Sequence, residues 1–351
     1  MADLTLALQQ QVLQAIENRQ PLTISAGQSK AFLSAAPTGD ILSVADHQGI
    51  VSYQPTELVV TVRAGTKLRE LQLALAEHNQ YLPFEPPHFG NDATIGGTIA
   101  AGLSGSSRPF TGSARDYVLG CKIINGRGQV LQFGGQVMKN VAGYDVSRLM
   151  VGAMGTLGVL LEISLKVLPV PASECYLSQF HTPQDALLLM QTLASQNLPL
   201  SGLGYDGEAV HIRLAGAAAA VRSAQQKLGG QHHDPDIFWS AINEQQHPFF
   251  AGDIPLWRIA VPPATAELPI TGKQLVDWAG GLRWVKTDET SDNLFKLAAR
   301  HHGHAQLFRS SQKAANRRQP LADGIRQLHI QLKHSFDPQA IFNRGQLYSD
   351  F

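Results

Sequence analysis

The sequence lacks the charge imbalance of a nucleic-acid-binding protein and the long apolar runs of a membrane protein. Its 28 Lys and Arg residues balance 28 Asp and Glu residues in a chain of 351, so we expect no electrostatic attraction to nucleic acid or to an anionic membrane. No stretch approaches the roughly 20 apolar residues of a membrane helix. The start, MADLTLALQQQ, lacks the basic and apolar segments of a secretory signal. We therefore expect a soluble, cytoplasmic chain.

Cysteine is also scarce, and the histidines lack the spacing of a metal site. Cys121 and Cys175 both lie in apolar, strand-like runs, which favours buried free thiols over a disulfide or a metal pair. The segment 301–304 (HHGH) and the pair at 232–233 contain no helical i, i+4 spacing and no obvious carboxylate partner. The sequence therefore predicts no metal site.

Glycine, by contrast, is dense between residues 93 and 171. These glycines separate short apolar runs, such as VLGCKII, that are typical of buried strands. The glycines are Gly96, Gly97, Gly102, Gly105, Gly152, Gly155 and Gly158. Because glycine costs backbone entropy on folding, such a set indicates close approach by a ligand or by other backbone. A tightly packed, turn-rich β protein is the alternative, and composition alone does not decide between them.

A second glycine-containing loop follows the first predicted strand. The pattern predicts a helix over residues 4–16 and a strand at 22–25, which runs into AGQSKAFL. Backbone N–H groups of such a loop can cradle a phosphate, although any strand–turn–helix junction looks similar. Further along, we expect strands within 41–62, a helix over 67–79 and a hairpin over 118–135.

Three motifs in a fixed order carry a family resemblance. TIGGTIAAGLSG, RDYVLG and GYDVSRLMVGAMGTLGV resemble the PCMH-type FAD-binding domain of the vanillyl-alcohol oxidase and D-lactate dehydrogenase superfamily. The resemblance implies an α+β fold with a two-subdomain FAD-binding domain at 1–171. It also implies a smaller α+β cap with an antiparallel sheet at 172–334, and a C-terminal segment at 335–351 that returns to the flavin domain.

The same resemblance implies FAD as the cofactor and two loops that bind its pyrophosphate. Many relatives carry a covalently attached flavin on a histidine where this chain has Gln28 and Ser29, so we expect non-covalent FAD. The implied cofactor-binding residues are Ala26, Gly27, Gln28, Ser29, Lys30, Pro86, Thr94, Ile95, Gly96, Gly97, Thr98, Gly102, Arg115, Gly152, Gly155, Thr156, Gly158 and Val159.

Two of these residues have plain structural alternatives, and one motif is a decoy. Pro86 fits a rigid wall beside the flavin or a simple bend. Arg115 fits a phosphate contact or a local ion pair with Asp116. The segment 202–207 satisfies G-x-G-x-x-G, but the residues after it alternate like a strand, whereas a dinucleotide site needs a helix there.

The cap and the C-terminal segment are less regular. We expect helices over 183–196 and 217–228, a short helix near Gln274, a strand over 304–309, and a C-terminal helix that ends at Asp337. HHGHAQLFR lies where metal-assisted relatives carry an HGDGNLH-like segment but lacks its aspartate, so the catalytic residues stay unassigned. Roles for His304 as a base and Arg309 as a carboxylate clamp are hypotheses. Arg344 stands where the family usually has proline.

Length, the QSKAFL loop, the reduced cap and the GHAQLFR strand are most similar to the E subunits of bacterial glycolate oxidases. That resemblance implies oxidation of the 2-hydroxy acid glycolate to glyoxylate, with electrons passed through a homologous FAD-containing subunit and an iron–sulfur subunit. Any association with the inner face of the membrane would come from those partners, without a direct membrane span. An FAD-binding assembly subunit without turnover and a stand-alone oxidoreductase for another hydroxy acid or sugar are the alternatives.

Overall fold

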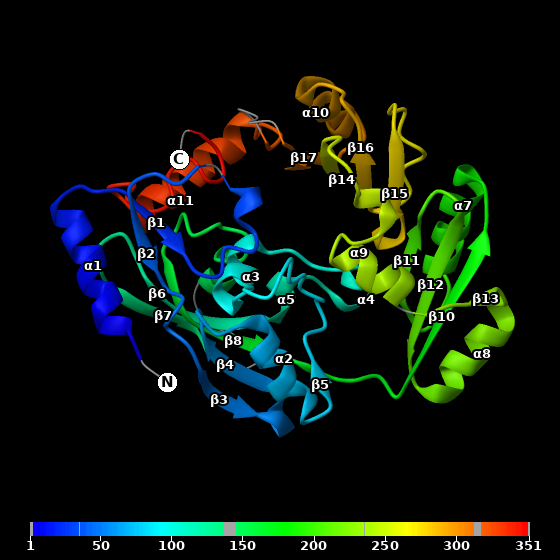
Figure 1. Ribbon diagram of the computed structural model, residues 1–351, viewed down its shortest axis with the longest axis horizontal. Coiled ribbons are helices and arrows are strands. Elements are labelled where there is room, and N and C mark those ends of the chain that lie inside the picture. Colours follow the sequence, from blue (N-terminus) through cyan, green and yellow to red (C-terminus); the bar gives the residue numbers. More distant parts are fainter. Residues whose placement is uncertain (1–2, 35, 136–144, 235, 312–316, 350–351) are drawn as a thin grey trace. The chain divides into compact units, whose positions relative to one another are not determined.

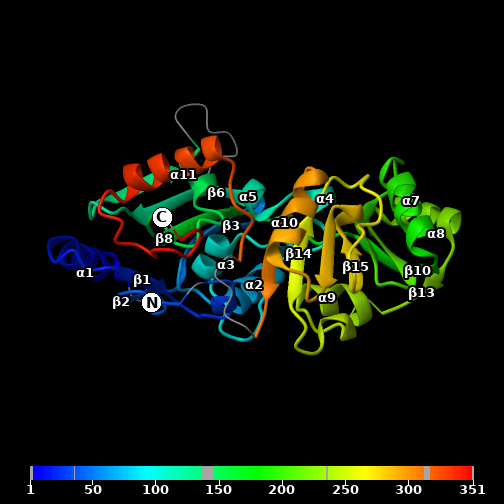
Figure 2. The same ribbon diagram turned by 90° about the horizontal axis from the view of Figure 1, so that it is seen from above.

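The computed structural model describes residues 3–34, 36–135, 145–234, 236–311 and 317–349. The chain forms two compact units (Figures 1 and 2). The first unit contains Met1–Ser104, Gly112–Val170 and Leu321–Phe351, and the second contains Gly105–Thr111 and Pro171–Pro320. Residues 143 and 144, at the start of the third motif, lie outside the described residues.

The main sheet of the first unit has five strands in the order β3-β4-β8-β6-β7, and each neighbouring pair is antiparallel. Its central strand has apolar residues on both faces, as VLLEISLK predicts, and both faces are covered. Helices α2 and α3 contribute Leu71, Leu75 and Ile99 to the core on this sheet. The elements are β3 (Ile50–Gln54), β4 (Val59–Arg63), α2 (Leu68–Ala76), α3 (Ile95–Ala101), β6 (Val118–Ile124), β7 (Val130–Gly134) and β8 (Val159–Lys166).

A second, smaller layer of this unit is built around two parallel strands. Strand β1 (Leu22–Ser25) pairs with β2 (Asp40–Ser43), and Leu22 also forms a parallel bridge with Phe342 near the C-terminus. The helix α1 (Thr5–Glu17) buries Leu8 and Val12 in this core. The unit is completed by β5 (Gln80–Tyr81), α5 (Ala114–Tyr117), α6 (Val146–Leu149) and β9 (Leu168–Pro169).

The last helix also belongs to the first unit. Helix α11 (Asp323–Phe336) carries Lys333, whose ammonium donates to the carbonyl oxygens of Thr156 and Phe342 and to Asp337, at 2.7, 2.8 and 2.7 Å. The division of the chain at residues 320 and 321 therefore differs from the expected boundary at 334 and 335. From the sequence alone, a lysine at the end of an amphipathic helix is predicted to be solvated. Only the folded structure places hydrogen-bond acceptors around Lys333.

The second unit contains a single sheet of eight strands in the order β13-β10-β12-β11-β15-β16-β14-β17, all paired antiparallel. Residues on alternate positions of β14 and β17 pack against α10, so that this face forms a closed core. The strands are β10 (Ser173–Phe180), β11 (Leu200–Tyr205), β12 (Ala209–Gly216), β13 (Gln231–His232), β14 (Leu256–Ala260), β15 (Lys273–Asp277), β16 (Leu282–Lys286) and β17 (His304–Arg309). The helical segments are α4 (Arg108–Thr111), α7 (Pro183–Ala194), α8 (Ala218–Leu228), η3 (Asp236–Ser240), α9 (Ala241–Asn243), η4 (Pro248–Phe250), η5 (Trp278–Gly280) and α10 (Ser291–Arg300).

Several expectations for the second unit are confirmed, and one is wrong. The G-x-G-x-x-G segment lies at the end of β11 and is followed by the strand β12, so the structure has no helix to face a nucleotide there. The short helix expected near Gln274 is instead the strand β15. It pairs with β16, and this pairing buries Leu275 and Val276. The secondary structure of a run this short is decided by the strand with which it pairs rather than by its own periodicity.

Both cysteines are free and buried, as predicted. Within the described residues, no helix is long and apolar enough to cross a membrane. Over the same residues, no three His, Cys, Asp or Glu side chains come together as a potential metal site.

We predict that Lys333→Met lowers the free energy of unfolding by about 3 kcal/mol, because it leaves Asp337 buried without its cation. Urea denaturation followed by circular dichroism measures this change. Gln331→Met, at an exposed position of the same helix, is the control and should stay within about 0.5 kcal/mol of the parent protein. Equal midpoints for Lys333→Met and the parent would contradict the structural role of the pair.

Candidate functional site

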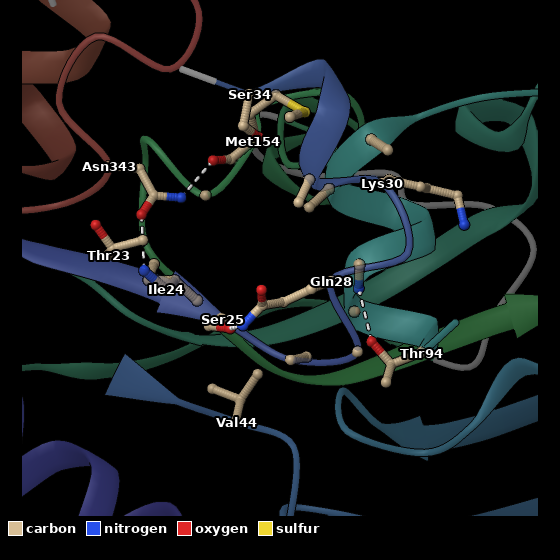
Figure 3. Close-up of a pocket in the computed structure, with 18 of the residues that line it drawn as sticks. Thr23, Ile24, Ser25, Gln28, Lys30, Ser34, Val44, Thr94, Met154 and Asn343 are labelled. Atoms are coloured by element: carbon tan, nitrogen blue, oxygen red, sulfur yellow. Dashed lines mark hydrogen bonds between the residues drawn. The ribbon is translucent and has the colours of Figure 1, made fainter. Parts of the chain in front are cut away.

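The first unit contains a cavity of about 270 Å³ beside β1 (Figure 3). Most of its wall is formed by β1 with the loop that follows it, by α3, by the turn before β8 and by the C-terminal segment. Ile41 of β2, Val44, Ala64 and Leu160 of β8 complete the lining. Apolar, small and polar side chains alternate in the lining, and Lys30 is its cation. Such a wall of backbone and small residues suits a ligand that is bound by N–H groups and by close approach of the chain.

The glycines in this wall have different physical roles. A Cβ on Gly27 would lie 1.5 Å from the carbonyl oxygen of Asp92, and one on Gly96 would lie 2.7 Å from Cβ of Ala64. These two glycines therefore allow protein segments to pack together. Gly97 differs, because an added Cβ would meet only the Thr94 hydroxyl, at 3.2 Å, and Gly97 is exposed at the lining. Of the three, Gly97 presents open space to a ligand.

Thr94 fixes the start of α3 at the cavity. Its hydroxyl accepts a hydrogen bond from the N–H of Gly97 at 3.2 Å, as an N-cap residue does. The preceding backbone is held by Leu68, whose N–H donates to the carbonyl of Ala93 at 2.8 Å. The loop 94–98 is thus fixed by one hydrogen bond within α3 and by another from the segment that contains Leu68.

Lys30 brings positive charge to the opposite loop. Its side chain is 8% exposed, and Nζ lies 3.4 Å from the Ser29 hydroxyl and 3.4 Å from the His88 carbonyl oxygen. The ammonium also lies 5.7 Å from the ring centroid of Phe89. A cation at the cavity wall favours an anionic ligand group such as a phosphate.

Asn343 is a lining residue that the sequence analysis missed. Its side-chain oxygen accepts from the N–H of Ile24 at 2.7 Å, and its amide nitrogen donates to the carbonyl of Met154 at 2.6 Å (Figure 3). One side chain therefore ties three distant segments together at the cavity wall. No local sequence pattern shows which residues of this C-terminal segment face a cavity.

The structure gathers ten of the predicted residues at the cavity and places eight elsewhere. The residues in the lining are Ala26, Gly27, Gln28, Ser29, Lys30, Thr94, Gly96, Gly97, Gly155 and Gly158. Those outside the lining are Pro86, Ile95, Thr98, Gly102, Arg115, Gly152, Thr156 and Val159.

Some of the outlying residues have clear packing roles. A Cβ on Gly102 would lie 2.8 Å from the nitrogen of Gly152, so these two glycines allow α3 to approach the turn before β8. Arg115 is exposed and donates to the carbonyl of Val151 at 3.4 Å. The ion pair with Asp116, one of the two alternatives for Arg115, is not formed; that carboxylate accepts from the N–H and hydroxyl of Ser113, both at 2.8 Å.

The fold matches that of a solved enzyme structure. Two crystal forms of alkyldihydroxyacetonephosphate synthase superpose with TM-scores of 0.69 at 16% and 14% identity, covering 97% and 96% of this chain and 75% and 74% of theirs. This likeness confirms the predicted PCMH-type fold. Residues 5–134 match the family described as FAD binding domain. The chain is therefore an FAD-binding protein of this fold class, and FAD is its cofactor.

A full-length relative narrows the class to a family. Glycolate oxidase subunit GlcE of Escherichia coli strain K12 is 45% identical over 348 residues, which cover 99% of this chain and 98% of that protein. The chain belongs to the GlcE family. Two further relatives match only about half of the chain. Glycolate oxidase subunit GlcD of Bacillus subtilis is 30% identical over 48% of this chain and 36% of its own length. D-lactate dehydrogenase of Anaerostipes hadrus is 31% identical over 45% of this chain and 33% of its own length.

We predict that Gly97→Leu weakens FAD binding on the order of a hundredfold, corresponding to about 2.7 kcal/mol, because its side chain would occupy the cavity. Flavin fluorescence titration of the FAD-free protein measures the affinity. Gly324→Leu is the matched control, since this glycine is also exposed in the first turn of a helix and an added Cβ meets nothing within 4 Å. Unchanged affinity in folded Gly97→Leu protein would show that FAD lies elsewhere.

Proposed function

We propose that this chain is the FAD-binding subunit of a glycolate oxidase and supports the oxidation of glycolate to glyoxylate. The relationship to GlcE carries the proposal, because 45% identity extends over both units and 98% of that protein. The shorter matches to dehydrogenases and to GlcD support the same class of reaction, the oxidation of a 2-hydroxy acid.

In this proposal the cavity holds the phosphate-bearing part of FAD. At about 270 Å³ it lies near the lower limit of small-molecule pockets and accommodates only a portion of a dinucleotide. The loops 26–30 and 94–98 would bind the pyrophosphate through backbone N–H groups, and Lys30 would offset its charge. The bound flavin supplies the hydride acceptor, and the protein supplies its position and surroundings.

The residues outside the lining keep a supporting role in this proposal. Gly102 and Gly152 let α3 and the turn before β8 approach each other, so they shape the wall without reaching the ligand. The same segments are supported, on the side away from the cavity, by buried residues: Ile95, Thr98, Thr156 and Val159. Pro86 is buried outside the lining and Arg115 is exposed, so we assign direct contacts to neither.

The partners in this proposal are a homologous FAD-containing subunit and an iron–sulfur subunit. The word subunit in the names of GlcE and of GlcD supports an assembly of several chains. Electrons from the hydroxy acid would leave through the iron–sulfur subunit. The chain would work on the cytoplasmic side and meet the inner face of the membrane only through its partners.

We predict that the flavin is bound without a covalent link. Gln28 and Ser29 occupy the loop where many relatives carry the attachment histidine, and the lining, within the described residues, has no histidine. Precipitation with acid should therefore release all of the flavin into the supernatant as intact FAD. Yellow colour that stays with the denatured pellet would contradict the prediction.

We predict that glycolate alone leaves the flavin of the isolated chain oxidised, and that adding the partner flavoprotein subunit allows its reduction. Anaerobic flavin absorbance measures the change, with D-lactate as the comparison. Bleaching by glycolate in the isolated chain would give this chain a complete substrate site of its own. A chain that binds no FAD after reconstitution would overturn the proposed function.

A further inference from the structure

The eight-stranded sheet buries a guanidinium group on its apolar face. Arg283 in β16 lies directly opposite Ile259 in β14, and directly opposed residues of antiparallel strands place their side chains on the same face. Ile259 and Val285, which is two residues further along β16, belong to the core beneath α10. Arg283 is only 1% exposed. A positively charged group therefore shares a face of the sheet with the apolar core.

The donor groups of this guanidinium are incompletely satisfied. One nitrogen, Nη2, donates to the carbonyl oxygen of Thr265 at 2.8 Å. The other two, Nε and Nη1, are buried and have no acceptor among the described residues, and no carboxylate among those residues forms an ion pair with Arg283. Buried donors without acceptors cost free energy, and the cost is largest where the group is charged.

The buried ammonium of Lys333 shows how this chain satisfies a buried cation elsewhere. Lys333 donates to two carbonyl oxygens and to the carboxylate of Asp337, so both its donors and its charge are matched. Burial lowers the pKa of Arg283 to about 10, and Glu267 opposes this shift from an exposed position. Arg283 therefore stays charged at neutral pH, where it has one carbonyl oxygen and a solvent-screened carboxylate as compensation.

A further buried donor lies on the same face of the sheet. The indole N–H of Trp257 has no acceptor among the described residues. Trp257 lies opposite Val285, which makes it the diagonal neighbour of Arg283, a spacing that long side chains can span. Buried donors in folded proteins are almost always paired, so a group of them without protein acceptors indicates a bound ion or water.

The segment 262–271, which joins β14 to β15, packs over this face. Leu268 and Ile270 belong to the core beneath α10, and the sheet residues Arg283 and Gln274 donate to the carbonyl oxygens of Thr265 and Leu268. Three residues of the segment are prolines, which have no backbone N–H. A segment with few backbone hydrogen bonds opens more easily than the strands that it joins, which gives a small ligand access to Arg283.

We propose that Arg283 binds a small monovalent anion with the chemistry of chloride, between β16 and the segment 262–271. One guanidinium group supplies one positive charge, which a monovalent anion neutralises. A guanidinium is weakly hydrated, and its apolar surroundings favour an anion that loses its hydration easily over phosphate or sulfate. Neither Arg283 nor Trp257 lines the flavin cavity, so the site adds a ligand beyond the proposed function.

The test is thermal unfolding of the FAD-loaded protein while chloride replaces gluconate at constant ionic strength. The melting temperature of the parent should rise and saturate, by roughly 3 °C at a chloride concentration tenfold above its Kd. Arg283→Met should show no rise. Without chloride, it should melt no lower than the parent, because the variant removes an uncompensated buried charge. Arg222→Met, an exposed arginine on α8, is the matched control and should keep the full response.

Diffraction from crystals of the FAD-loaded protein grown with bromide locates the ion. We expect an anomalous peak beside Nε or Nη1 of Arg283 and none in Arg283→Met. A peak that persists in Arg283→Met would be an adventitious ion only, and a water molecule in place of bromide would overturn the site. If Arg283→Met does not fold, the bromide peak and the chloride response of the parent still decide the question.

Glu267 is the internal alternative to a bound anion. An inward rotation of its carboxylate onto Arg283 would make Glu267→Gln melt lower than the parent and would leave the parent insensitive to chloride. Both results together would overturn the proposal. We expect Glu267→Gln instead to retain the rise with chloride, because the exposed carboxylate is not the group that Nε and Nη1 bind.

Discussion

The cavity of the first unit depends on the close contact of two backbone segments at Gly27 and Asp92. The space available to a Cβ on Gly27 is filled by the Asp92 carbonyl oxygen, 1.5 Å away, so the two segments approach as closely as bare backbone allows. This contact brings the loop after β1 beside the first turn of α3. Residues of both loops then line one cavity, and a bulkier residue at Gly27 would separate the loops.

The C-terminal segment closes the same site from far along the chain. Lys333 holds Thr156, Asp337 and Phe342 through one buried ammonium, and Asn343 joins Ile24 to Met154. Each of these polar groups would cost free energy if it were buried alone, so their mutual hydrogen bonds make the arrangement specific. The shape of the cavity wall and the stability of the first unit are therefore coupled through residues that follow the second unit in sequence.

The second unit shows how a single sheet serves two purposes. One face of β14 and β17 packs Trp257, Ile259 and Leu307 beneath α10, and the other face carries Arg258 and His304. The alternation of a strand separates the two sets by one residue, so an apolar core and a cationic surface come from the same sequence.

The sequence by itself determined the cofactor class and most of the elements. The order of TIGGT, RDYVLG and the later glycines identified the flavin fold, and local periodicity located β8, the hairpin β6–β7 and helices α2, α7 and α8. Tertiary structure alone decided that Gly97 faces the cavity while Gly102 and Gly152 pack on each other. It alone assigned α11 to the first unit, made β15 a strand, and brought Asn343 to the cavity. The physical reason is that local pattern encodes which residues prefer burial, whereas the neighbours that bury them come from contacts distant in sequence.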